Sequence, residues 1–266
     1  MTTFPETLKT DLRRVAGLMA DAARLETLRY FRKSDIGLEN KLSEGFDPVT
    51  IADRAAEDAM RRVLASERPD DAILGEELGT KDGTSGLQWV LDPIDGTRGY
   101  MSGTPTWGTL IAVSDANGPI FGIIDQPFIG ERFEGGWGVA ESNGPLGQGP
   151  IRTRATKSLS EATIFTTFPE VGTLAEGQAF QRVASRCRLT RYGTDCYAYA
   201  LLAAGQIDLV IEAGLNSYDI QAPIALVEAA GGILTTWDGG PAHNGGTGIA
   251  AANETIYREA LTVLRS

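Results

Sequence analysis

The chain has 266 residues, with 35 acidic and 24 basic side chains, one histidine and a net charge of −11. This length suffices for one large α/β domain or two closely packed halves with a substantial core. The acidic balance argues against nucleic-acid and anionic-membrane partners, because both require a basic surface. The N-terminus lacks a basic region followed by an apolar stretch, and no apolar run reaches the roughly 18 residues of a membrane span. We therefore expect a soluble, cytoplasmic protein.

The cysteines and the single histidine restrict the possible chemistry. Cys187 and Cys196 are nine positions apart and have no zinc-type spacing, so we expect two buried reduced thiols. His243 lies in a segment rich in glycine that is typical of a surface loop, and no motif supports a catalytic triad built on it. Any catalysis is therefore expected to depend on carboxylates.

The first half of the chain is expected to contain two helices followed by hairpins. Apolar residues spaced three and four apart predict a helix from about 5 to about 33, and a second helix is expected from about 50 to about 66 after the polar segment 34–49. Asp115 to Gly118 form a strong hairpin signal between two of the expected strands. The expected strands and hairpin lie at about 71–76, 87–92, 107–114, 119–125 and 131–140.

The stretch 141–150 is the most loop-like part of the chain and marks a boundary. It divides an expected N-terminal half, 1–145, from an expected C-terminal half, 150–266, with the two packed as one catalytic unit. After it, strands and helices alternate, which is typical of α/β layering. The strands are expected at 162–168, 188–192, 207–212, 232–237 and 248–252, and the helices at 173–186, 195–204, 219–230 and 254–265.

Two carboxylates end the most informative stretch of the sequence. Residues 89–97 read Trp-Val-Leu-Asp-Pro-Ile-Asp-Gly-Thr, so an apolar run delivers Asp92 and Asp95 to a corner restricted by proline. Both could be ordinary turn residues, since Asp-Pro and Asp-Gly are common turn pairs. An acid beside such an apolar run is costly to desolvate unless it is compensated, however, and this favours a site for divalent cations.

Further acids could complete such a site. Glu76 and Glu77 end another apolar run, and in a strand they would point to opposite faces, so only Glu76 is expected to face the site. The alternative is an acidic strand end at the surface. Thr50 and Asp53 have capping-box spacing, and Asp219 precedes a helical pattern, so each also has a purely structural interpretation as a helix cap.

These segments together resemble one family. Pro-Val-Thr-Ile-Ala-Asp at 48–53, Gly-Glu-Glu at 75–77, Asp-Pro-Ile-Asp-Gly-Thr at 92–97 and Tyr218-Asp219 before a helix that ends in Gly231-Gly232 are similar, in this order, to the inositol monophosphatase family of Mg²⁺-dependent, lithium-sensitive phosphatases. The resemblance implies an α/β (α+β) fold, a layered αβαβα sandwich of the inositol monophosphatase and sugar phosphatase type. It also implies a homodimer.

The resemblance assigns roles to individual residues. It implies a metal site for two to three Mg²⁺ ions, a group that positions and deprotonates the attacking water, and backbone donors to the phosphate at a helix N-terminus. The metal ligands would be Glu76, Asp92, Asp95, Asp219 and the carbonyl of Ile94; the water would be held by Glu76, Asp53 and Thr97; and the phosphate by Gly96 and Thr97. Lys41 matches a lysine of the family with loose spacing.

Two segments indicate the substrate. Residues 98–110 and 191–201 are similar to the histidinol-phosphate phosphatase branch, and inositol phosphatases carry a small residue where this chain has Asp195. Histidinol phosphate carries an ammonium group and an imidazole, so its pocket requires acceptors, which Asp195, Glu212 and Asp219 would provide. Asp195 could instead be the N-cap of the helix that follows it. Arg98 could reach a phosphate or cover the rim of the site.

The sequence therefore predicts a Mg²⁺-dependent phosphomonoesterase that acts on a small molecule, histidinol phosphate, in histidine biosynthesis. The alternative within the same family is an inositol-1-monophosphatase or another small-molecule phosphatase. A regulatory protein that only binds metal or phosphate would not need the water-activating Glu76, Asp53 and Thr97. A glycosidase with paired carboxylates would not need a metal-binding motif.

Overall fold

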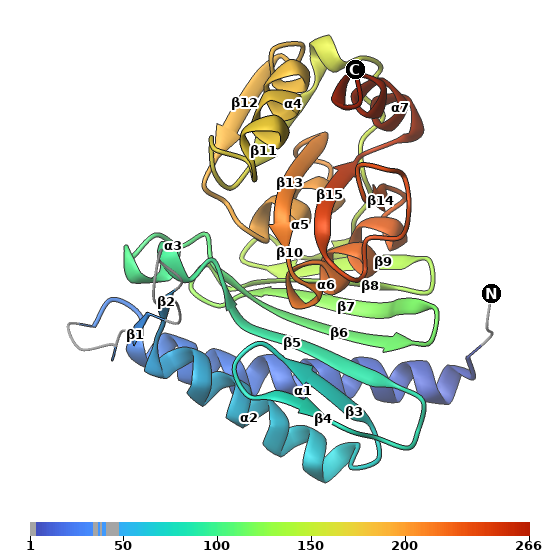
Figure 1. Cartoon of the computed structure of the whole chain (residues 1–266). Helices are drawn as coiled ribbons and strands as arrows, with labels where there is room; N and C mark the ends of the chain where they lie inside the picture. Colours follow the sequence, from blue (N-terminus) through green and yellow to red (C-terminus); the bar gives the residue numbers. More distant parts are fainter. Residues whose placement is uncertain (1–3, 34–36, 38, 41–47) are drawn as a thin grey trace.

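The computed structural model describes residues 4–33, 37, 39–40 and 48–266, and this part of the chain forms five layers (Figure 1). Helices α1 and α2 cover one face of a large sheet, α5 and α6 lie between this sheet and a smaller one, and α4 and α7 cover the far side. The expected αβαβα sandwich is thus confirmed. The helices span α1 (Glu6–Tyr30), α2 (Ile51–Glu67), α3 (Thr97–Met101), α4 (Leu174–Ala184), α5 (Tyr197–Ala203), α6 (Ser217–Ala229) and α7 (Glu254–Leu264).

The large sheet has the order β10-β9-β8-β7-β6-β5-β3-β4 among the described residues. All its neighbouring strands are antiparallel except β3 and β5, which run parallel. Its strands are β3 (Ala72–Gly75), β4 (Gly79–Lys81), β5 (Gln88–Asp95), β6 (Gly108–Asp115), β7 (Gly118–Gln126), β8 (Glu131–Gly136), β9 (Val139–Gly144) and β10 (Gly147–Pro150).

The smaller sheet has the order β12-β11-β13-β15-β14 in the described part of the chain, with β11 parallel to both of its neighbours. Its strands are β11 (Thr163–Thr166), β12 (Leu189–Tyr192), β13 (Leu209–Leu215), β14 (Ile233–Thr235) and β15 (Gly246–Ala251). A two-residue pair, β1 (Glu39–Asn40) with β2 (Pro48–Val49), precedes α2, and a short 3₁₀ turn, η1 (Leu159–Glu161), precedes β11.

Alternation along the strands explains how one chain builds three apolar layers. Successive side chains of a strand point to opposite faces of the sheet. In β5, Trp89 and Leu91 pack against α1 and α2, while Val90 faces α5 and α6. In β13, Val210 faces the same middle layer, while Leu209 and Ile211 face α4 and α7. Each sheet therefore needs apolar residues on both faces, which makes its central strands read as continuous apolar runs.

Helix α6 is the centre of the molecule. All residues from Ile220 to Val227 are buried, because the helix lies between the two sheets and has no solvent-facing side there. It packs closely on β7, where a Cβ on Gly122 would lie 2.6 Å from the carbonyl oxygen of Ala222. The start of this helix is thereby held at a fixed height over the large sheet.

The structure differs from the sequence-based expectations at the ends of several helices and strands. The first helix stops at Tyr30 rather than near 33, and the expected strand 71–76 stops at Gly75, so Glu76 and Glu77 lie in a turn. The short strand β4 after that turn was not expected. The stretch 141–150, expected to be a loop, forms most of β9 and all of β10 and extends the large sheet, because its glycines and serine still pair as a hairpin. The division into halves at 145 and 150 stays a prediction.

Candidate active site

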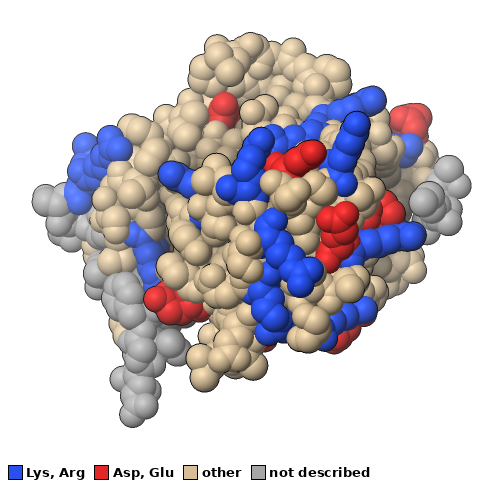
Figure 2. All heavy atoms as spheres, turned by 90° about the horizontal axis from the view of Figure 1, so that it is seen from above, with Lys and Arg blue, Asp and Glu red and all other residues tan. Residues whose placement is uncertain are grey.

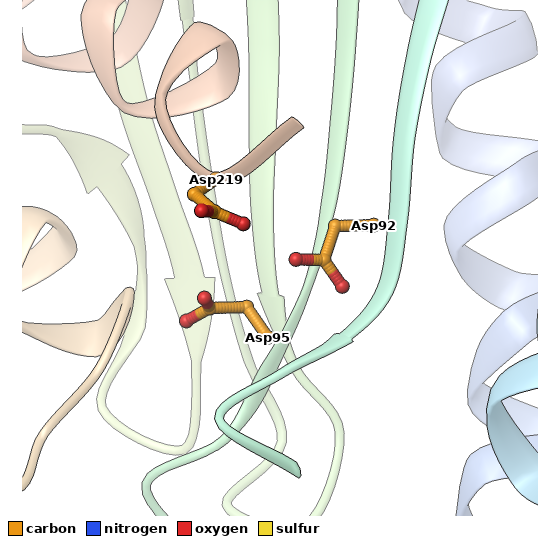
Figure 3. Close-up of side chains that lie close together, drawn as sticks. All are labelled: Asp92, Asp95 and Asp219. Carbon is orange, nitrogen blue, oxygen red and sulfur yellow. The ribbon is translucent and has the colours of Figure 1, made fainter. Parts of the chain in front are cut away.

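Three carboxylates from two distant parts of the chain meet at one point. Asp92 and Asp95 lie at the end of β5 and Asp219 in the first turn of α6, and one carboxylate oxygen of each lies within 4.8 Å of the others. Figure 3 shows the three side chains around a common space. Asp92 is almost fully buried, with 2% of its surface exposed. Oxygen ligands of this kind suit a hard divalent cation such as Mg²⁺.

A β-bulge brings the first two carboxylates together. Residues three apart in a regular strand point to opposite faces. The pairing of β5 with β6 shifts here, however, since Asp92 pairs with Leu110 and Asp95 with Gly108, which leaves one extra residue on β5. The extra residue reverses the alternation. Asp95 can therefore lie on the same side as Asp92.

Asp219 is held by the start of α6. The N-cap is Asn216, and its backbone N–H donates to Asp219 Oδ2 at 2.6 Å in a capping box. The alternative interpretation of Asp219 as the N-cap itself is thus wrong by three positions. Because Oδ2 serves the cap, Oδ1 is the oxygen that Asp219 can offer to a cation.

Asp95 is fixed from the other part of the chain. The backbone N–H of Cys196, which precedes α5, donates to Asp95 Oδ2 at 2.6 Å. The cluster thus joins β5 to both α5 and α6.

The thiol of Cys196 is buried and free, and Cys187 is free but only half-buried, so the expected burial of both thiols is wrong for Cys187.

The three carboxylates are poorly solvated and repel one another. Burial, together with the charges of Glu76, Asp95 and Asp219, raises the pKa of Asp92 well above its ordinary value. Burial and the charges of Asp195 and Asp219 raise the pKa of Asp95 in the same way. Burial raises the pKa of Asp219 to about 7. A divalent cation would reverse this cost by supplying positive charge, so the donor set fits a metal.

These shifts predict an unusual dependence of stability on pH. Burial raises the pKa of Asp53, Asp195 and Asp219 to about 7 from an ordinary value of 3.8. The folded state therefore retains protons that the unfolded state releases, and these groups lower the free energy of unfolding as the pH rises from about 4 to about 7. In the presence of chelator, we expect a higher Tm at pH 5 than at pH 7.5.

Added Mg²⁺ should raise the Tm more at pH 7.5 than at pH 5, because a cation binds the deprotonated carboxylates. Thermal unfolding followed by circular dichroism with chelator and with Mg²⁺ checks both expectations. Asp71 and Asp208 have the opposite effect on the free energy of unfolding, and they have it at lower pH, because arginine partners help to lower their pKa values. A Tm in chelator that rises steadily from pH 5 to pH 7.5 would contradict the assignment of these shifts.

Asp53 lies at the start of α2 and has one oxygen without a partner. Its Oδ2 accepts hydrogen bonds from the backbone N–H of Thr50 at 2.8 Å and from the Thr50 hydroxyl at 2.5 Å, which confirms the expected capping box. Among the described residues, the buried Oδ1 of Asp53 has no hydrogen-bond partner. A buried acceptor left in this way is costly, so it points to a water or an ion.

Glu76 borders the cluster from the turn after β3. Its backbone N–H donates to the carbonyl oxygen of Leu91 at 3.1 Å, and its carboxyl shares a hydrogen bond with Asp92. It lines the same pocket as Asp95 and Asp219. The structure therefore places Glu76 beside the three carboxylates, although a turn rather than a strand aims it there.

The segment after Asp95 turns into a short helix. Gly96 adopts a left-handed conformation with φ of 87° and is the N-cap of α3, as the family resemblance implied. The Thr97 hydroxyl donates to the carbonyl oxygen of Ile94 at 3.1 Å, and the Ile94 N–H donates to Asp92 Oδ1 at 3.0 Å. The Ile94 carbonyl keeps a second lone pair that a cation could use.

A cavity of about 300 Å³ opens beside the cluster and includes all three predicted substrate acceptors. Asp195 has a φ of 44°, and a Cβ on Gly96 would lie 2.8 Å from its carboxyl carbon. The N-cap of α5 is Cys196 and makes no side-chain cap bond, so the alternative interpretation of Asp195 as the N-cap is wrong. Asp195 instead occupies the wall of the pocket.

Glu212 is less available than expected. Its Oε1 accepts from the N–H and hydroxyl of Thr167, and its Oε2 accepts from the hydroxyl of Tyr199 at 2.9 Å. Burial raises its pKa, although these bonds oppose the shift. Thr167 and Tyr199 carry no motif, so the sequence did not reveal that they occupy this carboxylate.

At the rim, the Arg98 guanidinium lies over the ring of Phe168, 4.9 Å from its centre. Both residues line the pocket, and the charge of Arg98 opposes the rise in the pKa of Asp195. Phe168 is a pocket residue that no sequence motif selects. Lys41 lies outside the described residues.

The negative charge is unevenly distributed. Figure 2 views the end of the molecule formed by α4 and α7, where basic side chains gather among fewer acidic ones. These two helices and the segment after α4 carry Arg182, Arg186, Arg188 and Arg258. The face seen in this view is therefore more basic than the chain as a whole. Within the residues that the structure describes, no helix combines the length and apolar character needed to cross a membrane.

Comparison with known proteins gives one consistent result. The model of the inositol monophosphatase family matches residues 9–265. The chain is 43% identical over 228 residues to the chloroplastic bifunctional phosphatase IMPL2 of Arabidopsis thaliana, covering 85% of this chain but only 64% of that protein. It is 33% identical to a histidinol-phosphatase of Streptomyces coelicolor, covering 94% and 96% of the two chains. A solved inositol monophosphatase from Zymomonas mobilis superposes with a TM-score of 0.85 at 37% identity, covering 99% and 100%.

Proposed function

The chain belongs to the inositol monophosphatase family and is a phosphatase, and we propose that it hydrolyses histidinol phosphate with bound Mg²⁺. The observation that carries the phosphatase chemistry is the cluster of Asp92, Asp95 and Asp219 beside the start of α3. Clustered carboxylates hold divalent cations, and a site that combines such cations with backbone N–H donors suits a phosphate ester. We propose two to three Mg²⁺ ions, with Glu76 and the Ile94 carbonyl as further ligands.

Asp195 supports the choice of substrate. Its carboxylate lies on the pocket wall next to Gly96, close enough to Asp95 to raise the pKa of that residue. An ammonium group on the substrate would form a charge-assisted hydrogen bond there, whereas a neutral polyol would leave a buried charge without compensation. The histidinol-phosphatase relative supports the same choice, while the similar inositol monophosphatase structure keeps inositol 1-phosphate as the alternative.

The metal supplies part of the chemistry and the chain supplies the rest. Bound Mg²⁺ would lower the pKa of a water molecule and neutralise charge on the leaving oxygen. Asp53 Oδ1, which has no partner among the described residues, would accept a hydrogen bond or a proton from that water. The Thr97 hydroxyl donates a hydrogen bond to the Ile94 carbonyl, so its oxygen keeps lone pairs that would orient the water. We assign water activation to Glu76, Asp53 and Thr97 together.

The substrate is held from two sides in this proposal. The N–H groups of Gly96 and Thr97, which lie at the start of α3 and line the pocket, would donate to the phosphate, and Arg98 would add a positive charge at the rim. Asp195 and Asp219, with a smaller contribution from Glu212, hold the cationic part. No histidine or covalent nucleophile is needed. The homodimer and the cytoplasmic location expected from the sequence stay predictions.

A parallel assay tests the proposal. Phosphate release should be measured from histidinol phosphate and from inositol 1-phosphate, each with Mg²⁺ and with chelator. We expect turnover with Mg²⁺ that chelator abolishes, and a kcat/KM at least about tenfold higher for histidinol phosphate, since a buried charge pair distinguishes the two. Phosphate release that continues in the presence of chelator would contradict the metal-dependent mechanism. A preference for inositol 1-phosphate would mean that this ester is the substrate and would leave the proposed phosphatase chemistry unchanged.

A further inference from the structure

We propose that Glu57 is a positioning residue that fixes the turn carrying Glu76 and thereby sets the affinity of the site for Mg²⁺. This inference rests on the proposed function, because it concerns a side chain assigned there as a metal ligand and water-activating group. Glu57 belongs to none of the sequence motifs that indicate the site, and its side chain does not line the pocket. Its effect would reach the cluster only through the backbone of the turn 75–78.

Glu57 is a fully buried carboxylate that accepts two hydrogen bonds from the turn and one from its own helix. Its exposed fraction is 0%. Oε2 accepts from the backbone N–H of Glu77 at 2.7 Å, and Oε1 accepts from the N–H of Leu78 at 3.2 Å and from Arg61 Nε at 2.8 Å. Three donors converge on two oxygens, which is the arrangement that makes a buried carboxylate tolerable.

The turn is shaped to receive this carboxylate. A Cβ on Gly75 would overlap Oε1 and Cδ of Glu57, so only glycine lets the side chain lie against the backbone. Arg61, one helical turn further along α2, donates from Nη2 to the carbonyl oxygen of Gly79 beyond the turn. Helix α2 thus bonds to the second half of the turn and to the residue that follows it.

Glu76 lies at the middle of the held segment. Its own N–H is bonded to Leu91 in β5, and the next N–H, that of Glu77, is bonded to Glu57. The backbone of Glu76 is therefore fixed against β5, the strand that carries Asp92, and its neighbour Glu77 is fixed against α2. Asp53 precedes Glu57 by four residues and so lies on the same face of α2. One helix thus supplies Asp53 directly and holds Glu76 indirectly.

A purely structural role for Glu57 makes a different prediction. If Glu57 only stabilised the turn, its loss would lower the Tm and leave the metal affinity of the folded protein unchanged. If it positions Glu76, the affinity must fall in molecules that are still folded, because groups that orient metal ligands typically contribute about 10–100-fold to affinity.

The test is Glu57→Gln, measured by isothermal titration of the folded protein with MgCl₂ and by activity over a range of Mg²⁺ concentrations. Since all three partners of Glu57 are donors, the amide nitrogen of glutamine must face one of them. We expect about tenfold weaker Mg²⁺ binding and an activity loss that high Mg²⁺ partly restores. Asp58→Asn is the matched control, because Asp58 is the exposed neighbour and, within the described part of the chain, forms an ion pair with Arg62 alone.

Gly75→Ala perturbs the same contact from the turn and serves if Glu57→Gln does not fold. It should weaken Mg²⁺ binding to a similar extent. In a double-mutant cycle, Gly75→Ala should add little to Glu57→Ala, because the two closest contacts of its methyl group, both with Glu57, are then absent and the remaining one, Arg61 Nη2 at 2.8 Å, is the end of a flexible side chain.

Folded Glu57→Gln and Gly75→Ala proteins that bind Mg²⁺ within about twofold of the unchanged chain would overturn the proposal. Fully additive losses of Mg²⁺ affinity in the double-mutant cycle would also overturn it, since they would mean that Gly75→Ala acts through a residue other than Glu57. Glu76→Gln, measured alongside, separates this failure from that of the proposed function. If Glu76→Gln itself binds Mg²⁺ and turns over normally, the assigned role of Glu76 is wrong; if only that variant is impaired, Glu57 is not its positioning residue.

Discussion

Asp95→Asn is expected to lower kcat/KM by at least about 10²-fold and to weaken Mg²⁺ binding. Asp95 Oδ2 is occupied by the N–H of Cys196 at 2.6 Å, and its side chain belongs to the cluster within 4.8 Å. Asparagine keeps the shape and can still accept from Cys196. Its amide nitrogen would then face the cation with N–H donors, so the variant removes a ligand without removing the packing.

Steady-state kinetics and isothermal titration with MgCl₂ measure this effect, and Tm in chelator reports folding. Because desolvation and the charges of Asp195 and Asp219 raise the pKa of the half-buried Asp95, the metal-free variant should be at least as stable as the unchanged chain near pH 7.5. Asp82→Asn, an exposed acid outside the cluster, is the control for the change of charge. Near-normal activity of Asp95→Asn would show that Asp95 is only a turn residue.

Asp195→Asn is expected to separate the substrates. It should lower kcat/KM for histidinol phosphate at least about tenfold and have a much smaller effect on p-nitrophenyl phosphate, which carries no cationic group. Burial and the charge of Glu212 raise the pKa of Asp195 to about 7, and Arg98 opposes the rise. The carboxylate is thus ready to be stabilised by a substrate ammonium group, and asparagine removes that attraction.

Asparagine is the appropriate substitution because Asp195 has a φ of 44°, a conformation that asparagine tolerates better than alanine. Asp195→Ala should show the same selectivity with an added loss of stability. Equal losses on both substrates in both variants would place Asp195 in a structural role. If Asp195→Asn keeps the selectivity of the unchanged chain for histidinol phosphate over p-nitrophenyl phosphate, other residues of the pocket recognise the cationic group.

Local patterns predicted most of the fold. Buried strands such as β5 and β6 read as apolar runs, the turn at Asp115 produced the expected hairpin, and the capping box at Thr50 started α2 as expected. These features depend on neighbouring residues only. The ends of elements were less predictable, and β10 was missed because Gly147 to Pro150 has no apolar pattern and pairs only as the outer strand of a hairpin.

The site was predictable as a set of residues and less so as a geometry. Motifs selected Asp92, Asp95 and Asp219, which do meet. The bulge that turns Asp95 to the side of Asp92 depends on pairing with β6, so the strand alone does not reveal it. In the same way, the occupation of Glu212 by Tyr199 depends on a long-range contact.

The position of Asp219 at the start of α6, far along the chain from β5, has a consequence for the order of events during synthesis. The ribosome releases Asp92 and Asp95 more than a hundred residues before Asp219. A nascent chain that ends before Ser217 cannot hold the three-carboxylate cluster, and it also lacks the helix on which the middle layer is built. The cluster can therefore form only after the segment that carries Asp219 has been synthesised.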